Sequence, residues 1–344
     1  MFDEVIKKIL ESIDESSILT ETYPKFSGEG YRAHKIDAKN FHEINPLLSG
    51  KKIAFIDGGN AEIIGSANFS LNLVRVCYAI YQNNKKIKSE RFDFFAFVKA
   101  VNESGEICFK TEFFGNDNLG LKNVFFSSFD STLMLGISRA EIGSVSNAVR
   151  RFAELKLAKS VSDSNLADII VLDGNLQATL TNEGKYLDEL CESCEENKII
   201  LSALGKTNSL FTEHGNLLSA VLGSIAKMQR WFYHPIADIH SYSHKAEMFF
   251  VKLHEKSRHV FRFEIFNVQK MMAEKTINEI SSNCCDPIFL GYPYGLVEAD
   301  RIARVSNQEK EMLKTEILVR LRNKNVEKYL NASNAHEILD RISF

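Results

Sequence analysis

The sequence predicts an α/β fold in which a mixed β-sheet is flanked by helices. Three strand-like runs come first in close succession, and helical and strand-like patterns then alternate to the end of the chain. Two of the strand-like runs, "IAFIDGG" (53–59) and "ADIIVLDG" (167–174), are continuously apolar and stop on Asp-Gly. Continuous apolar runs are typical of strands in the middle of a sheet, so both aspartates are expected just past the ends of central strands.

The composition limits the class of protein. The chain has 344 residues, of which 44% are hydrophobic and 25% charged, and its formal net charge is −3. These values are typical of a globular protein and argue against one that coats DNA generally. They do not exclude a nucleic-acid enzyme, because a local basic rim around an acidic centre is sufficient. No apolar segment approaches the length of a membrane span, so a cytoplasmic location is expected.

The first half of the chain predicts one helix and three strands. Apolar residues fall on one side of a helix that starts at the N-terminus, and a polar, irregular stretch follows to Gly50. Strands are predicted over 53–56, 69–81 and 91–101, and the turn residues in "QNNKKIKSE" indicate a hairpin between the second and third. Residues 103–135 give no secure pattern. The apolar side of the predicted N-terminal helix comprises Phe2, Ile6, Ile9, Leu10 and Ile13.

In the second half of the chain, helical and strand-like patterns alternate. The strongest helix is "SRAEIGSVSNAVRRFAELKLAKSV", in which Ile142, Val145, Val149 and Phe152 form one apolar stripe. After the second Asp-Gly strand, helices are predicted over 180–196 and 215–228, and strands over 198–207, 246–254 and 259–266. Helical patterns end the chain. The active end is expected at the carboxyl ends of the strands.

Asp57 and Asp173, each followed by glycine, are the strongest candidates for chemistry. Two carboxylates brought together repel each other unless a cation neutralises them, and Mg²⁺ and Mn²⁺ prefer carboxylate oxygens. Two such ions can flank a scissile phosphate. The alternative is that Asp-Gly simply marks a hairpin turn. Neither Asp-Gly is followed at once by a second apolar strand, which weakens that interpretation.

Five short motifs, in order, resemble the NurA nucleases. They are "IAFIDGGNAEIIGSANFSLNLVRVCYAIY", "VRRFAELKLAKS", "DIIVLDGNL", "LSALGKTNSL", and "VFRFEIF" followed by "GYPYGLVEADRIARV". Together they span roughly residues 50 to 305. The resemblance implies a nuclease core over 50–305, between an N-terminal helical or irregular segment (1–49) and a C-terminal helical segment (306–344).

The resemblance also implies a ribonuclease-H-like fold and a DNA nuclease that uses two Mn²⁺ or Mg²⁺ ions. Its activity would be that of a 5′-to-3′ exonuclease, with single-strand endonuclease activity as an addition. A homodimer that docks on a HerA-type hexameric ATPase during DNA end resection is implied as well.

The site residues implied by the resemblance are carried over one at a time. Asp57, Glu154, Asp173 and Asp300 match acidic positions that bind metal, although the family often has histidine at the last of these. Lys206 matches a phosphate contact and completes the expected catalytic set. Tyr294 is a weaker phosphate contact.

For each of these residues, an ordinary structural role without chemistry stays open as the alternative. Glu154 points away from the apolar stripe of its helix, which alone indicates solvated surface, and Glu141 on the stripe side is the fallback. Lys206 is equally an exposed charge at a strand end. Asp300 is equally an exposed partner of a neighbouring arginine, Arg301 or Arg304.

Two other functions compete with nuclease activity. A member of the family that has lost a ligand would act as a DNA clamp or scaffold on the ATPase ring. Strand-Asp-Gly loops also bind phosphates in actin-like ATPases, but no second, duplicated half is evident. The six cysteines, including the pair in "CESC", are expected to be reduced thiols rather than zinc ligands. The basic stretches "NNKKIKSER" and Arg150, Arg151, Lys156 and Lys159 either contact phosphates or solvate their surface.

Overall fold

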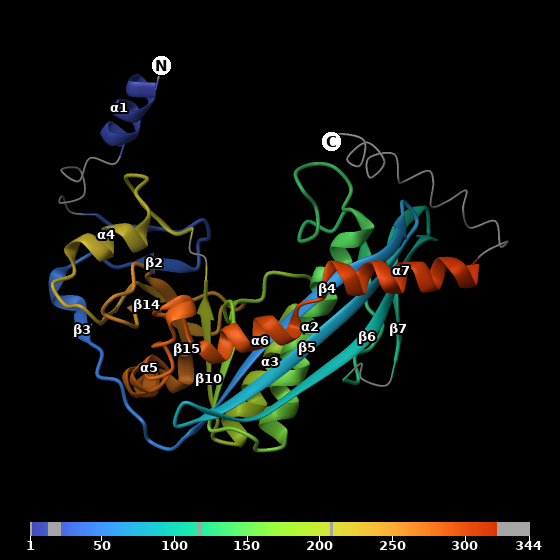
Figure 1. Cartoon of the computed structure of the whole chain (residues 1–344). Coiled ribbons are helices and arrows are strands. Elements are labelled where there is room, and N and C mark those ends of the chain that lie inside the picture. The colour runs from blue at the N-terminus through green and yellow to red at the C-terminus, as the bar shows by residue number, and fades with distance from the viewer. Residues whose placement is uncertain (1, 13–21, 116–118, 207–208, 322–344) are drawn as a thin grey trace. The chain divides into compact units, whose positions relative to one another are not determined.

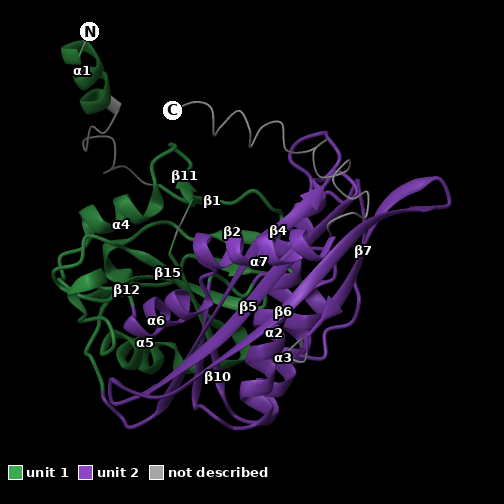
Figure 2. Ribbon diagram, turned by 45° about the vertical axis from the view of Figure 1, so that its right-hand side comes forward, with its two compact units in different colours: residues 1–47, 174–176, 202–292 green, residues 48–173, 177–201, 293–344 purple. Residues whose placement is uncertain are grey.

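The computed structural model describes residues 2–12, 22–115, 119–206 and 209–321 (Figure 1). The chain divides into two compact units that exchange segments (Figure 2). The first unit comprises residues 1–47, 174–176 and 202–292, and the second comprises residues 48–173, 177–201 and 293–344. Each unit is described by itself.

The second unit contains a mixed sheet in the strand order β9-β4-β5-β6-β7-β8. All neighbours are antiparallel except β4 and β9, which are parallel. The predicted mixed sheet is therefore confirmed. Its elements are β4 (Lys52–Ser66), β5 (Phe69–Gln82), β6 (Lys85–Glu103), β7 (Glu106–Phe114), β8 (Phe125–Ser127), the short 3-10 turn Ile142–Ser144, α2 (Val145–Asp163), β9 (Ile169–Asp173), α3 (Glu183–Glu196), α6 (Tyr294–Ala303) and α7 (Asn307–Leu321).

The strand that carries Asp57 does not stop at Asp-Gly, and this prediction was wrong. β4 continues through Gly58 and Gly59 to Ser66, because β5 pairs with it along its whole length. The strand that ends beside Asp57 is β9, the parallel neighbour of β4, whose last residue is Asp173. Asp57 therefore lies inside a long strand, at the point where that strand loses one of its two partners.

Helices cover both faces of this sheet (Figure 1). Successive residues of a strand point to opposite faces. A side chain at Gly58 would meet α2, whereas Phe55, three positions earlier, packs against α6 at Gly295. A Cβ atom at Gly295 would lie 2.0 Å from Cδ2 of Phe55, so only glycine permits this close approach of helix to sheet. The helix α3 packs beside α2.

Buried ion pairs tie the C-terminal helices to the sheet. The guanidinium of Arg75, on β5, is 3% exposed and lies 2.7 Å from Asp93 and 2.6 Å from Glu309 at the start of α7. On α6, the buried Glu298 lies 2.8 Å from Nζ of Lys86, which is on β6. Removing one partner of such a buried pair leaves an uncompensated charge, so these contacts fix the helices in place.

The first unit contains an antiparallel sheet in the order β3-β12-β14-β15-β10, and two further strand pairs, β1 with β11 and β2 with β13. Its elements are α1 (Phe2–Ser12), β1 (Pro24–Lys25), β2 (Tyr31–Ala33), β3 (Phe41–Glu43), β10 (Ile200–Gly205), β11 (Phe211–Thr212), α4 (Leu218–Ile225), β12 (Trp231–Tyr233), β13 (Ala237–Ile239), β14 (Ala246–Lys252), β15 (Phe261–Phe266) and α5 (Ala273–Ser281).

A buried carboxylate organises the first unit. Glu264, on β15, is fully buried and pairs with Nε2 of His244 at 3.0 Å and with Nε of Arg262 at 2.6 Å. Its second oxygen accepts the backbone N–H of Leu176, and the Tyr31 hydroxyl lies 2.9 Å from Nδ1 of His244. Although burial raises the pKa of Glu264, Arg262 and His244 lower it more, to about 2.

Most predicted elements are confirmed, including the hairpin, whose turn at Asn83–Asn84 has positive φ at both residues. The unassigned stretch 103–135 contains β7 and β8. The N-terminal helix is present over 2–12, and its apolar side chains are exposed, whereas Ile13 lies outside the described residues. None of the helices that the structure describes is long and apolar enough to cross a membrane.

We expect Glu264→Gln to destabilise the protein by roughly 3 kcal/mol at neutral pH. The pKa of this carboxyl falls from 4.5 to about 2 in the folded protein, and each tenfold gain in acidity stabilises the folded state by about 1.4 kcal/mol. Because the folded-state pKa is the lower one, this contribution is complete above pH 4.5 and is lost as the pH falls towards 2. Urea unfolding of both proteins from pH 7 down to about pH 2 measures the difference and its loss in acid.

The matched control is Glu274→Gln, which removes an exposed carboxylate from α5 in the same unit. Its unfolding free energy should stay within about 0.5 kcal/mol of the parent protein at every pH. A Glu264→Gln protein that is as stable as this control at pH 7 would contradict the assignment.

Candidate metal centre

The parallel pairing of β4 with β9 brings Asp57 and Asp173 to the same level. Phe55 lies opposite Val171 and Ile56 opposite Leu172, and the two aspartates are the next residues on each strand. Adjacent strands lie about 4.8 Å apart, and residues in parallel register point to the same face. Both carboxylates therefore sit at the carboxyl end of β9, as the sequence predicted for Asp173.

Asp57 is buried beside β5 and α6. Asp57 is 6% exposed, and its Oδ1 accepts the backbone N–H of Gly58 at 2.7 Å. On the neighbouring strand, Cys77 lies opposite Asp57, and its Sγ is 3.1 Å from the Ala299 carbonyl oxygen of α6. The aspartate is thus enclosed by β5 and α6 on the sides away from β9.

Glu154 of α2 lies over Gly58, the residue that follows Asp57 on β4. A Cβ atom at Gly58 would lie 2.7 Å from Oε1 of Glu154 and 3.0 Å from its Cγ. The absence of a side chain at Gly58 therefore makes the space that the glutamate occupies. Glu154 is 5% exposed, so the interpretation of this residue as solvated surface is wrong. The reason is that α2 is buried on more than its Ile142–Phe152 stripe.

Two arginines balance the buried charge of Glu154. Nη1 of Arg150 lies 3.3 Å from Oε1, and Nη1 of Arg151 lies 3.5 Å from Oε2. Burial raises the pKa of the Glu154 carboxyl, the two arginines oppose that rise, and the charge of Asp173 adds to it.

The Oε1 atom of Glu154 is fully buried and accepts no hydrogen bond, although Nη1 of Arg150 lies 3.3 Å away as an ion-pair partner. Buried polar atoms are nearly always hydrogen-bonded, so such an atom in a cluster of acids requires an explanation. A divalent cation supplies one, since carboxylate oxygens are the ligands that Mg²⁺ and Mn²⁺ prefer. Asp57, Glu154 and Asp173 offer only such oxygens, and the donor set fits a hard cation.

The side chains of Asp57, Glu154 and Asp173 do not form a coordination shell in this structure. Among the residues that the structure describes, no group of three or more His, Cys, Asp or Glu side chains is arranged to hold a metal ion. Asp57 and Asp173 are neighbours through strand register, and Glu154 lies over Gly58, the residue after Asp57.

The other two predicted site residues, Asp300 and Lys206, have contacts of their own. Asp300, on α6, is 38% exposed and its Oδ2 accepts from Arg304 at 3.0 Å. Lys206 follows β10 in the first unit, where its Nζ lies 5.7 Å from the ring of Tyr292, and its neighbour Thr207 lies outside the described residues.

Two further sequence candidates have ordinary surroundings. Glu141, the fallback for Glu154, is exposed before α2. Tyr294, at the start of α6, packs edge-on against Tyr81 with ring centroids 6.3 Å apart.

Sequence reasoning missed the role of Arg150 and Arg151, which it interpreted either as phosphate contacts or as solvated surface charges. Arg150 also donates to the Gly58 carbonyl oxygen at 2.9 Å, and Arg151 lies 2.8 Å from the buried Glu183. Their spacing from Glu154, four and three residues along one helix, is the spacing at which helical side chains meet. That spacing was the available signal.

Three comparisons place the chain among known proteins. A family model described as the NurA domain matches residues 51–305. No curated protein matches the chain. Among solved structures, the NurA nuclease from Sulfolobus solfataricus is similar over 93% of each chain, with 15% identity and a TM-score of 0.51. The predicted ribonuclease-H-like fold is confirmed.

A second solved structure, endonuclease V of Ciona intestinalis bound to DNA, is more distant. It has 13% identity and a TM-score of 0.38 over 80% of this chain and 92% of the other. A match at that level carries no weight for the fold.

We expect Gly58→Ala to destabilise the protein by about 1–3 kcal/mol, because the new methyl group overlaps Glu154 and also lies 3.0 Å from Val76. Thermal or urea unfolding measures the loss. Gly184→Ala is the matched control, since a Cβ atom there meets nothing within 4 Å and alanine favours the helix α3. Equal stability of the two variants would show that Glu154 does not occupy the space above Gly58.

Proposed function

Because this chain belongs to the NurA family, we propose that it is a metal-dependent deoxyribonuclease that hydrolyses phosphodiester bonds. The observation that supports the proposal is that β4 and β9 bring Asp57 and Asp173 to the same level of the sheet, while Glu154 of α2 lies over Gly58, the residue after Asp57. The buried Oε1 atom of Glu154, which has no hydrogen bond, supports a cation at that place.

The three carboxylates would hold Mn²⁺ or Mg²⁺, with two ions as the proposed number. When bound, such ions supply activation of water and stabilisation of the leaving oxygen in phosphodiester hydrolysis. Arg150 and Arg151 keep the cluster from accumulating unbalanced negative charge. Gly58 keeps the space above β4 open for Glu154, and β5 and α6 close the far sides of Asp57.

Two residues are proposed with less structural support. Asp300 follows Ala299 on α6, and the Ala299 carbonyl oxygen accepts a hydrogen bond from the Cys77 thiol. Because Cys77 lies opposite Asp57, this part of α6 is near Asp57. We propose it as a fourth metal ligand. Lys206 is proposed as a phosphate contact on the resemblance of "LSALGKTNSL" to the family motif alone.

The finer properties follow from the family and are proposals for this chain. They are 5′-to-3′ exonuclease activity with additional single-strand endonuclease action, a homodimer, a HerA-type hexameric ATPase as partner, and a role in DNA end resection. The nuclease core is proposed to span residues 50–305.

Asp57→Asn and Asp173→Asn are each expected to lower Mn²⁺-dependent degradation of linear DNA by about a hundredfold or more. Metal ions contribute several kcal/mol to such reactions, and each 1.4 kcal/mol is a factor of about ten in rate. The measurement is the initial rate of DNA degradation, with circular dichroism to show that each variant is folded.

Asp168→Asn is the control for these variants, because it changes an exposed aspartate next to the opposite end of β9. Its activity should equal that of the parent protein. Undiminished cleavage in both site variants would exclude the assignment. A parent protein that binds DNA but never cleaves it would support the clamp instead.

Glu154→Gln and Glu141→Gln decide which glutamate of the helical region binds the metal. We expect Glu154→Gln to weaken Mn²⁺ binding, measured by calorimetry, by at least about tenfold, because a carboxylate ligand is replaced by a neutral amide. Glu141→Gln should bind Mn²⁺ as the parent protein does, since Glu141 is exposed. The reverse result would assign the ligand to Glu141, and unchanged binding in both would remove α2 from the site.

A further inference from the structure

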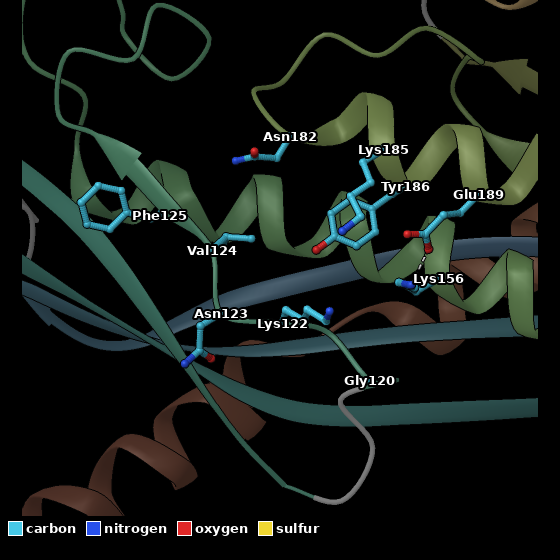
Figure 3. A pocket seen from close by; sticks show the side chains of 10 residues that line it. All are labelled: Gly120, Lys122, Asn123, Val124, Phe125, Lys156, Asn182, Lys185, Tyr186 and Glu189. Atoms are coloured by element: carbon cyan, nitrogen blue, oxygen red, sulfur yellow. Dashed lines mark hydrogen bonds and ion pairs between the residues drawn. The ribbon is translucent and has the colours of Figure 1, made fainter.

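A cavity of about 460 Å³ lies in the second unit, outside the acidic cluster (Figure 3). Its walls come from α2, from α3 and from the segment that leads into β8. The size is within the range of small-molecule sites. We call it the lysine pocket, after Lys122, Lys156 and Lys185, which come from these three elements.

The charge of the lysine pocket is positive. Nζ of Lys156 lies 2.6 Å from Glu189, so these two charges cancel. Lys122 and Lys185 are exposed, and neither forms an ion pair with any residue that the structure describes. Two ammonium groups from separate elements thus face one cavity without a counter-charge, which suits a ligand with a doubly charged anionic group such as phosphate.

The pocket also has aromatic walls. Tyr186 is held rigidly, because its ring stacks on Phe152 with centroids 4.7 Å apart and Nζ of Lys156 lies 5.5 Å from its centroid. Phe125, at the start of β8, is 46% exposed. An exposed aromatic ring beside basic groups is the combination with which proteins bind single nucleotides of a strand, by stacking on the base and pairing with the phosphate.

The lysine pocket is separate from the candidate metal centre. Both use α2, but Glu154 and Lys156 are two residues apart, and each residue of a helix turns it by about 100°. Glu154 points to the sheet at Gly58, whereas Lys156 points to α3 at Glu189. A ligand in the pocket would therefore lie on the opposite side of α2 from the acidic cluster.

We propose that the lysine pocket binds a nucleotide, with its phosphate on Lys122 and Lys185 and its base against Phe125. The nucleotide is either a free nucleoside 5′-monophosphate or the same unit within a single DNA strand. This site does not take part in hydrolysis and does not depend on the metal centre being active.

Calorimetric titration with deoxyadenosine 5′-monophosphate tests the proposal in EDTA, where no metal at the acidic site can bind phosphate. The parent protein should bind the nucleotide, and Lys122→Ala/Lys185→Ala should bind it at least tenfold more weakly. Phe125→Ala should weaken binding of the nucleotide but not of inorganic phosphate. Lys52→Ala/Lys85→Ala, which removes two exposed lysines that do not line the pocket, is the matched control and should bind as the parent does.

Absence of nucleotide binding in the parent, or equal binding in the pocket and control variants, would overturn the proposal. So would phosphate binding as tight as nucleotide binding, because the aromatic wall would then contribute nothing. A thermal unfolding curve for each variant shows whether it is folded. Asp57→Asn should retain full nucleotide binding, so failure of the nuclease assignment and failure of this one are told apart.

A second titration, with an oligomer of ten thymidylates, separates the two sources of the nucleotide. Binding of the oligomer that is tighter than that of thymidine 5′-monophosphate, and that is lost in Lys122→Ala/Lys185→Ala, would assign the pocket to a DNA strand. Binding of the monophosphate alone would assign it to the free nucleotide.

Discussion

The acidic cluster depends on the burial of one carboxylate over one glycine. Glu154 descends from α2 to the backbone of β4 because Gly58 has no side chain, and it stays there because Arg150 and Arg151 balance its charge. An isolated carboxylate is too costly to bury without partners. Gly58, Arg150 and Arg151 together therefore allow Glu154 to be buried against β4.

The difference in length between β4 and its parallel neighbour β9 determines where Asp57 and Asp173 lie in the sheet. β4 continues to Ser66 while its parallel neighbour β9 ends at Asp173. Past that end, the Gly58 amide is satisfied by the carboxylate of Asp57 itself. The end of β9 inside a wider sheet thus puts Asp57 and Asp173 at one level, beside the point where Glu154 lies over Gly58. Ligand sites of α/β sheets commonly lie at such carboxyl ends.

Two buried glutamates show how a structural carboxylate differs from a candidate ligand. Glu264 has both oxygens engaged, by Arg262, His244 and the Leu176 amide, and its pKa is lowered. In Glu154 one oxygen accepts no hydrogen bond and the pKa is raised, chiefly by burial. Ionisable groups whose pKa is perturbed in this way within polar clusters are where ligands and catalysis are found, whereas satisfied buried pairs mainly fix a fold.

The sequence by itself determined the mixed sheet, the hairpin, and the central position of the two Asp-Gly strands, because apolar runs and turn residues are local signals of burial and chain reversal. It placed Asp173 correctly at a strand end. It could not show that β4 continues beyond Asp57, since that depends on pairing with β5. Nor could it show that Glu154 is buried, because α2 is covered on a side that its apolar stripe does not mark. The lysine pocket joins three segments distant in sequence, and only tertiary packing brings their charges to one cavity.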